Sequence, residues 1–258
     1  FRWFIDAESE ARATARVAVE DQGDARIAVV YPDIGYGRRM ADWFMDEAKA
    51  RGATIVLYDG YNRSETDFTH LASRVASARP DALYIPDTAG KVGQLTAFLA
   101  QANVWGIDGT RRPDPRSKRR QVHYLGTSLW NEPALLRQSA SYVTGALIPA
   151  WSSAAFAGED NGRFFGAHAR VTGRDADALA SFSYDAVQFV RSAFAAGVAD
   201  PLGVRELAGA PKAYRGVTGP TRFTASGEPV RVLRFITVGE GRFAPTERTA
   251  TVGIPDET

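Results

Sequence analysis

The chain has 258 residues, which is enough for one large α/β domain or two small lobes with a sizeable core. Its hydrophobic content of 45% and charged content of 24% are ordinary for a globular protein, and its net charge of +1 is distributed as an acidic body with one basic segment, which excludes a nucleic-acid binder by bulk charge. The sequence has no cysteine, which excludes disulfides and thiolate chemistry, and no apolar run long enough to span a membrane.

The chain begins with Phe1 to Phe4, a segment whose pattern predicts the tail of a strand. A helix is predicted over 6–20, and it leads directly into a buried strand over 26–31. Because this start reads as the middle of a fold, we expect an upstream half to lie outside the sequence. No export signal is visible, and a start of this kind gives no information about export.

Short apolar runs alternate with helical periods from residue 26 to residue 150. Strands are predicted over 26–31, 54–58, 82–86, 122–125 and 143–148, with helices between them over 40–48, 68–75, 92–102 and 133–142. Parallel strands need a crossover connection, which such helices provide. The pattern therefore predicts an α/β fold, a doubly wound parallel sheet with helices on both faces.

The second half of the chain changes character twice. Between 157 and 200 the pattern predicts helices alone, and the longest spans 175–197, with apolar positions at Leu179, Phe182, Val187, Val190 and Phe194. From residue 216 the pattern predicts strands over 217–223 and 230–238, followed by a further strand at Phe243.

One segment is strongly basic. Between Arg111 and Arg120 there are six basic residues, one acid (Asp114) and two prolines, Pro113 and Pro115. Prolines and like charges disfavour regular structure and burial, so the sequence predicts an exposed, mobile loop between a helix and a strand. Its possible role is contact with anionic envelope lipids or an acidic partner, and the alternative is a solvated turn.

The sequence Gly35-Tyr-Gly-Arg-Arg-Met40 follows a strand and opens a helix, as a dinucleotide-binding loop does. That loop needs a third Gly or Ala where Met40 stands, for close packing of the helix against the strand. A nucleotide-dependent α/β enzyme is therefore only a remote alternative.

Several motifs along the chain resemble one known family. The resembling segments are Val29-Val30-Tyr31-Pro32-Asp33 with Tyr36-Gly37, Pro80-Asp81-Ala82-Leu83-Tyr84, Leu125-Gly126-Thr127-Ser128-Leu129-Trp130, Ser183-Tyr184-Asp185-Ala186-Val187, and Gly216-Val217-Thr218-Gly219 with Phe223 and Gly227. The chain resembles the periplasmic-binding-protein-like (type 1) receptors of the branched-chain amino-acid type. These sequence motifs are similar to those of ABC-transporter substrate-binding proteins and of bacterial activators of penicillin-binding proteins.

The resemblance implies a two-lobed organisation. Residues 1–158 and 228–258 would form the second lobe, and residues 159–227 would be the remainder of an incomplete first lobe. It also implies a non-enzymatic module of the bacterial cell envelope, periplasmic or anchored to the outer membrane, whose lobes close by a hinge around a small-molecule ligand. The alternative is a regulatory lipoprotein that activates a membrane-bound cell-wall synthase and has no nutrient ligand.

Candidate ligand-binding residues follow the predicted strands. They are Asp33, Tyr36, Asp87, Thr88, Ser128 and Trp130. Because ligands bind outside the carboxyl ends of parallel strands, we predict that Tyr36, Asp87 and Ser128 converge on one cleft. For Tyr36 the alternative is a ring that covers the helix start, for Asp87 and Thr88 a helix cap, and for Trp130 packing of the helix.

The segment from Thr127 to Trp130 departs from the resembled receptors, which place an acid about there to pair with the ligand's ammonium group. Ser128 carries no charge, and Glu132 lies further along the helix. A buried ammonium without a counter-charge is costly. We therefore predict that free leucine, isoleucine and valine do not bind with micromolar affinity, unless Asp33 or Asp87 substitutes.

The sequence shows no set of residues for catalysis, a metal or a cofactor. The three histidines, His70, His123 and His168, share no ligand or triad spacing. The carboxylate pairs Glu8/Glu10 and Glu159/Asp160 are interpreted as solvated. The prediction is a protein that is not an enzyme and that uses no cofactor.

Overall fold

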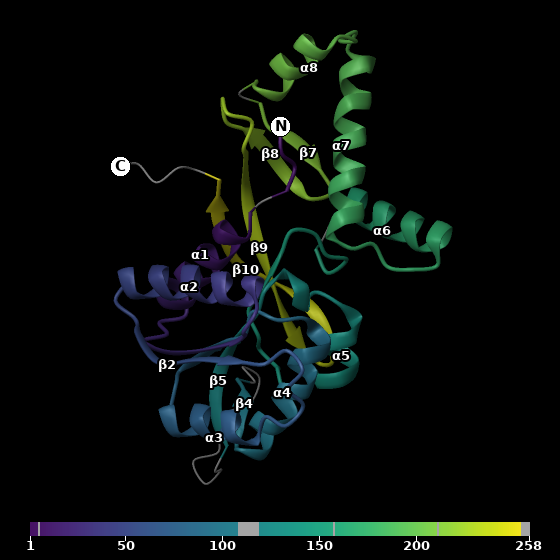
Figure 1. The fold of residues 1–258 in the computed structure, drawn as a ribbon. Helices are drawn as coiled ribbons and strands as arrows, with labels where there is room; N and C mark the ends of the chain where they lie inside the picture. Colours follow the sequence, from purple (N-terminus) through teal and green to yellow (C-terminus); the bar gives the residue numbers. More distant parts are fainter. Residues whose placement is uncertain (5, 108–118, 157, 211, 254–258) are drawn as a thin grey trace.

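The computed structural model describes residues 1–4, 6–107, 119–156, 158–210 and 212–253 (Figure 1). In chain order its elements are α1 (Ala7–Arg16), η1 (Val17–Asp21), β1 (Arg26–Pro32), α2 (Gly35–Ala50), β2 (Thr54–Tyr61), α3 (Thr69–Ala78), β3 (Ala82–Tyr84), α4 (Ala89–Gln101), β4 (Val104–Gly106), β5 (Arg120–Leu125), η2 (Ser128–Trp130), α5 (Pro133–Ser139), β6 (Ile148–Ala150), α6 (Glu159–Thr172), α7 (Ala178–Ala195), α8 (Pro201–Ala208), β7 (Tyr214–Gly216), β8 (Gly219–Phe223), β9 (Pro229–Gly239) and β10 (Arg242–Val252).

The first half of the chain forms a parallel sheet in the order β2-β1-β3-β5-β4. Every neighbouring pair in this sheet is parallel, so each strand ends at the same edge. In β1, which lies between β2 and the central strand β3, Ile27 to Val30 are fully buried, as a continuous apolar run in a two-faced sheet requires.

Helices cover both faces of this sheet. Side chains alternate along β1: Ile27 and Val29 pack with α1 and α2, whereas Ala28 and Val30 pack with α3, α4 and α5. In Figure 1 the two helix layers lie on opposite sides of the sheet. The predicted doubly wound α/β fold is thereby confirmed.

A second sheet is antiparallel, in the order β10-β9-β8-β7, with β6 also paired to β9. The long strand β9 joins two regions, because Arg231 pairs with Thr221 of β8 and Ile236 pairs with Ile148 of β6. Figure 1 shows α6, α7, α8, β7 and β8 grouped at one end of β9 and the parallel sheet at the other. The predicted lobe boundary between 227 and 228 falls in the turn between β8 and β9.

Phe1 to Phe4 do not form the predicted strand. Arg2 N–H donates to the Gly227 carbonyl over 2.9 Å, which is a single backbone contact and not a ladder. Aromatic rings hold the segment: Trp3 lies 5.7 Å from Phe189 and 5.3 Å from Phe223, centroid to centroid. Ring packing against α7 and β8 therefore replaces sheet pairing here.

The strand predicted over 143–148 is also wrong. Gly145 has φ of 77°, and a Cβ there would lie 2.0 Å from the Ile107 carbonyl oxygen, so the backbone turns at a position that only glycine fits. Leu147 makes one bridge to Leu125, and β6 begins only at Ile148. The strand β4 is a further difference, because its three residues carry no periodicity that a sequence pattern could show.

Most of the predicted basic loop, residues 111–118, lies outside the described residues. Its end is described and differs from the prediction. The Arg119 guanidinium lies over the Trp105 ring at 4.2 Å, and Arg120 is the first residue of β5, paired with Val104. The prediction of an exposed, mobile loop is therefore wrong for Arg120, which belongs to a strand.

Helix α1 begins at a well-formed cap. The Asp6 carboxylate accepts the Ser9 N–H over 2.7 Å, which satisfies one of the free donors of the first turn. Replacing Asp6 with alanine is expected to lower the free energy of unfolding by about 1 kcal/mol. Urea unfolding measures this, with Asp46→Ala on the exposed side of α2 as the control, expected within about 0.5 kcal/mol of wild type. Equal effects of the two substitutions would contradict the capping role.

Candidate functional site

The carboxyl ends of β1, β3 and β5 lie side by side in the parallel sheet. Tyr36 lies in the first turn of the helix after β1, Asp87 follows β3, and Ser128 begins the short helix after β5. The topology therefore brings the three predicted residues to one edge, in neighbouring columns. This row is the candidate site.

Tyr36 lies close to two carboxylates at this edge. Burial raises the pKa of Tyr36, the negative charges of Glu10 and Asp87 raise it further, and the neighbouring Thr127 hydroxyl opposes the rise. Charges act this strongly only over short distances. The phenol thus stands half-buried between acidic groups that come from α1 and from the end of β3.

Asp87 is 8% exposed and bonded through both oxygens. Its Oδ2 accepts the Tyr61 hydroxyl over 2.5 Å, and its Oδ1 accepts the Thr88 N–H over 2.6 Å. Burial, reinforced by the Asp87 charge, raises the pKa of Tyr61 and keeps it a donor. Thr88 is the N-cap of α4, but its side chain makes no capping bond and is exposed at the edge.

The main surprise at the site is Glu10, interpreted from the sequence as solvated. It is 5% exposed, and its Oε1 accepts the Ser128 N–H over 2.9 Å while its Oε2 accepts the Trp151 indole N–H over 2.8 Å. Burial raises the pKa of Glu10, and these hydrogen bonds oppose the rise. The solvated interpretation is wrong for Glu10, because it lies on the buried face of α1, and so is the premise that no acid lies near Ser128.

Two other candidates lie differently from the prediction. Trp130 is fully buried, donates from its indole to the Ile85 carbonyl over 3.2 Å, and packs so closely on Gly126 that a Cβ there would lie 2.5 Å from the ring. It fills the core below the strand ends, so its assignment as a ligand contact is wrong. Asp33 points outward, with its side chain 49% exposed and ion-paired to Arg38.

The loop after β2 adds a residue that sequence reasoning missed. The Glu65 carbonyl accepts the Lys91 ammonium over 2.7 Å, and this ammonium lies 5.5 Å from the centre of the Phe68 ring. Lys91 is in the first turn of α4, so the loop lies beside Thr88. The Glu65 residue is exposed there. The sequence could have indicated Glu65, because this residue follows a strand of the same parallel sheet.

Tyr84, the last residue of β3, lies beneath this edge. Its ring stacks on Phe44 with centroids 4.0 Å apart, and its buried hydroxyl has no hydrogen-bond partner among the described residues. Burial raises the pKa of Tyr84, and the charges of Tyr36 and Glu10 add to the rise. The hydroxyl is thus a polar atom left unbonded below Tyr36.

Two of the histidines and the other carboxylate pair make local contacts. His123 Nδ1 lies 2.7 Å from Asp24 Oδ1, and His168 Nδ1 lies 3.0 Å from the Arg174 carbonyl oxygen. Glu159 and Asp160 are exposed, as predicted, and both also pair with Arg163. In the described part of the chain no three His, Cys, Asp or Glu residues gather to hold a metal, and no helix there could cross a membrane.

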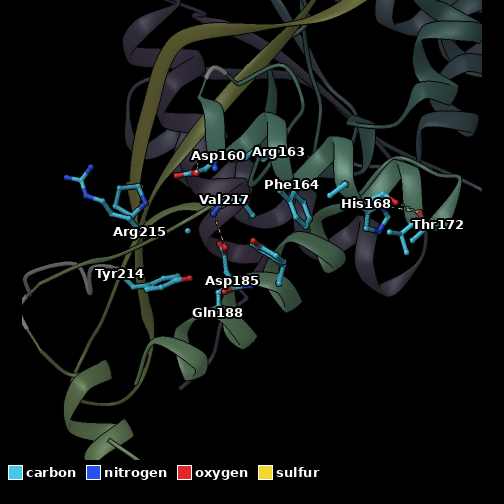
Figure 2. Close-up of a pocket in the computed structure, with 15 residues that line it drawn as sticks. Asp160, Arg163, Phe164, His168, Thr172, Asp185, Gln188, Tyr214, Arg215 and Val217 are labelled. Carbon is cyan, nitrogen blue, oxygen red and sulfur yellow. Dashed lines mark hydrogen bonds and ion pairs between the residues drawn. The ribbon is translucent and has the colours of Figure 1, made fainter. Parts of the chain in front are cut away.

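A separate pocket of about 850 Å³ lies between α6, α7 and β7. Figure 2 shows Asp185 on α7 beneath Val217, with Phe164 and His168 of α6 further along the wall. Asp185 is fully buried and accepts the N–H groups of Val217 and Thr218, each over 2.8 Å. It ties α7 to the turn before β8, which is a structural role.

Helix α7 is apolar on two sides. Phe182, Phe189 and Ala193 are buried against the rest of the structure. The exposed surface beside this buried stripe carries apolar side chains, at Leu179, Tyr184, Val187, Val190 and Phe194. We call these five residues the outer face of α7. Exposed apolar side chains gathered on one helix are typical of a surface that packs against another element.

Comparison with known proteins places this fold. The family model described as periplasmic binding protein matches residues 1–242. The Leu/Ile/Val-binding protein BraC3 of Rhizobium johnstonii is 29% identical over 106 residues, which are 40% of this chain and 29% of that protein. The chain thus matches less than a third of the length of this curated relative.

Two solved structures share the fold. A putative branched-chain amino acid ABC transporter protein from Rhodospirillum rubrum superposes with a TM-score of 0.78 at 21% identity, covering 95% of this chain and 67% of that one. A solute binding protein of an ABC transporter from R. palustris, in complex with benzoate, gives 0.74 at 18% identity, covering 100% and 67%. With the family model matched over residues 1–242, the chain belongs to the periplasmic binding protein family.

Proposed function

We propose that this chain is part of a solute-binding protein of an ABC transporter and binds a small organic solute in the periplasm or at the envelope membrane. The observation that carries the proposal is the row of Tyr36, Asp87, Thr88 and Ser128 along one edge of the parallel sheet. This edge is where open α/β sheets bind ligands. The names of the relatives, an amino-acid-binding protein and a benzoate-bound solute binding protein, support the same class.

Binding in this class of protein requires a second surface opposite the row. We propose that residues 1–158 and 228–258 form one lobe, and that 159–227 belong to the other, whose remaining part is outside this chain. The solved relatives are longer, since the chain covers 67% of each. A ligand that contacts both lobes stabilises the closed arrangement, which is how binding becomes a change of shape.

The outer face of α7 fits this division. Its exposed apolar side chains and the adjoining pocket of Figure 2 together form a surface that a monomeric domain seldom leaves open. We propose that the rest of the first lobe packs there. The same packing would place the first lobe over the helices α6 and α7 and leave the row at Tyr36 free for the ligand.

The charges at the row indicate which part of a ligand meets it. Glu10 and Asp87 already accept hydrogen bonds from protein donors, whereas Glu65 is exposed. Because the Lys91 ammonium lies beside Glu65 at the same edge, the charges there balance, and we propose that the row meets a polar, hydrogen-bonding part of the ligand. The prediction that free leucine, isoleucine and valine do not bind assumed that no acid lies near Ser128, and Glu10 lies there. It stays a prediction, and calorimetry decides it.

The test is calorimetry on the complete, ligand-stripped gene product with leucine, isoleucine, valine and benzoate as probes. For the probe that binds, Tyr36→Phe is expected to weaken binding two- to tenfold through loss of one hydroxyl, and Tyr36→Ala by at least about tenfold. Tyr142→Phe is the matched control, because that ring packs on Trp105 away from the row. Binding that is unchanged by Tyr36→Ala would sink the site assignment.

The other functions weighed from the sequence gain no support from the described contacts. Met40 is 1% exposed, so its side chain fills the core at the position where a dinucleotide-binding loop needs a third Gly or Ala. The role as an activator of a cell-wall synthase stays a prediction. A solute that binds tightly at the row would count against it.

A further inference from the structure

Glu10 connects three parts of the chain at the row. It lies on α1, the first helix, and its Oε1 accepts the Ser128 N–H of the row over 2.9 Å. Its Oε2 accepts the indole N–H of Trp151 over 2.8 Å. Trp151 follows β6 and begins the connection to α6, which lies in the group of elements at the other end of β9 (Figure 1). A single carboxylate therefore fixes a residue of the row relative to the connection between the two groups of elements.

The charge of Glu10, unlike its hydrogen bonds, costs stability. The residue is 5% exposed, and burial raises its pKa although the donors on Ser128 and Trp151 oppose the rise. The charged form is therefore less favourable in the folded protein than in the unfolded chain. Groups that carry such a cost and contact a candidate binding residue are candidates for a functional role.

The titratable side chains that face Glu10 from other elements are tyrosines. Burial raises the pKa of Tyr36 on α2 and of Tyr84 on β3, and the Glu10 charge adds to the rise in both. Both hydroxyls therefore stay neutral at any pH at which a carboxyl group titrates. The Asp87 charge also acts on Tyr36. A change of charge on Glu10 is therefore not masked by the two tyrosines.

The charged groups of α1 itself are engaged elsewhere. Glu8 pairs with Arg12, and Arg12 also pairs with Glu47 of α2. Where α1 packs against β10, the Arg16 guanidinium donates to the Thr251 carbonyl over 3.1 Å. In the described part of the chain, no ion pair compensates the buried carboxylate.

Protonation of Glu10 removes an acceptor that two donors need. A carboxylate offers two acceptor oxygens, whereas a carboxylic acid turns one of them into a donor. With the proton bound, the Ser128 N–H and the Trp151 indole N–H compete for the oxygen that remains a good acceptor. One of the two hydrogen bonds is then lost, and Ser128 is no longer held relative to Trp151.

We propose that Glu10 is a positioning residue of the solute site, whose carboxylate holds Ser128 in the place that binds the solute and whose protonation weakens binding. This inference rests on the proposed function, because it requires that the solute meets the row at Ser128. Glu10 acts through Ser128 and not by contact, since it is buried and both of its oxygens are engaged. The protein thereby binds its solute less tightly in acidic surroundings.

Calorimetry on the complete, ligand-stripped gene product between about pH 5 and 7 tests the proposal, with leucine, isoleucine, valine and benzoate as probes that keep their charge in this range. For the probe that binds, affinity is expected to fall two- to tenfold toward the acidic end, as loss of one hydrogen bond predicts. Glu10→Gln should bind about as weakly as the wild type at acidic pH, without this pH step. Glu8→Gln is the matched control on the same helix and should follow the wild type at every pH.

Trp151→Phe separates positioning from general damage to the fold. It removes one of the two donors, so the Ser128 N–H keeps an acceptor whether Glu10 is charged or neutral. Binding should persist in this variant, and the pH step should shrink. A further measurement needs no variant at the site: in NMR spectra of the wild type, the Ser128 N–H and the Trp151 indole N–H should shift with one common midpoint as the pH changes.

The outcomes separate this role from the proposed function. A pH step that is the same in the wild type and in Glu10→Gln, or undiminished in Trp151→Phe, overturns the positioning role and leaves the proposed function standing. Two N–H resonances without a common midpoint also overturn the positioning role. If none of the probes binds at any pH, the proposed function fails, and the role of Glu10 in binding fails with it.

Discussion

Replacing Asp185 with alanine is expected to lower the free energy of unfolding by about 3–5 kcal/mol. The substitution leaves the N–H groups of Val217 and Thr218 without their acceptor in a fully buried position. It also removes the charge that compensates Arg231, whose guanidinium is 2% exposed and donates to Thr218 Oγ1 over 2.6 Å. Urea unfolding of the variant and the wild type measures the loss.

The state of Arg231 explains why the loss should be large. Burial lowers the pKa of Arg231 to about 10, and the Asp185 charge is what opposes a further fall. Without that charge the native state holds an uncompensated cation among the rings of Trp3 and Phe182. Asp177→Ala, which removes only the N-cap of the same helix, is the control and should cost about 1 kcal/mol. Losses of equal size would refute the network.

The second large effect is expected at Glu10. Its replacement by alanine leaves the Ser128 N–H and the Trp151 indole N–H unpaired, and at about 1–3 kcal/mol for each buried donor the loss should total about 2–6 kcal/mol. Glu8→Ala on the same helix is the control, because Glu8 is half-exposed and its ion pair among the described residues is with Arg12. That variant should stay within about 0.5 kcal/mol of wild type.

The same residue gives stability a dependence on pH. Burial raises the pKa of Glu10 above its ordinary value of 4.5, so the native state binds the proton more tightly than the unfolded chain does. Between 4.5 and the raised native pKa, stability therefore falls as the pH rises, and above the native pKa the cost is complete. The difference in unfolding free energy between wild type and Glu10→Gln should shift in favour of wild type as the pH falls through this window. A difference that does not vary with pH would contradict a raised pKa.

The sequence was sufficient for the sheet and for the position of the row. Apolar runs separated by helical periods require parallel strands, and the carboxyl ends of parallel strands meet at one edge. Tyr36, Asp87 and Ser128 follow from these two rules without knowledge of any contact. The prediction for Trp130 failed because two positions after Ser128 the short helix η2 turns the side chain back into the core.

Glu10 shows what local sequence cannot reveal. A helix with acids at positions 8 and 10 resembles any solvated first turn, and the groups that bury Glu10 lie 118 and 141 residues away in sequence. Only the packing of α1 beside the strand ends brings Ser128 and Trp151 to its carboxylate. Likewise the turn at Gly145 depends on the Ile107 carbonyl, which no periodicity in the segment 143–148 records.

Strand β9 carries a mechanical consequence for the molecule. Arg231 still pairs with β8 and Arg234 already pairs with β6, whereas Val232 and Leu233 between them pair only with Thr251 and Ala250 of β10. The sheet is therefore two strands wide at this point and wider on either side. A two-stranded segment bends and twists more easily than a broader sheet. Bending of the molecule therefore concentrates at Val232 and Leu233. Substitutions intended to stiffen the sheet should be made at these two residues.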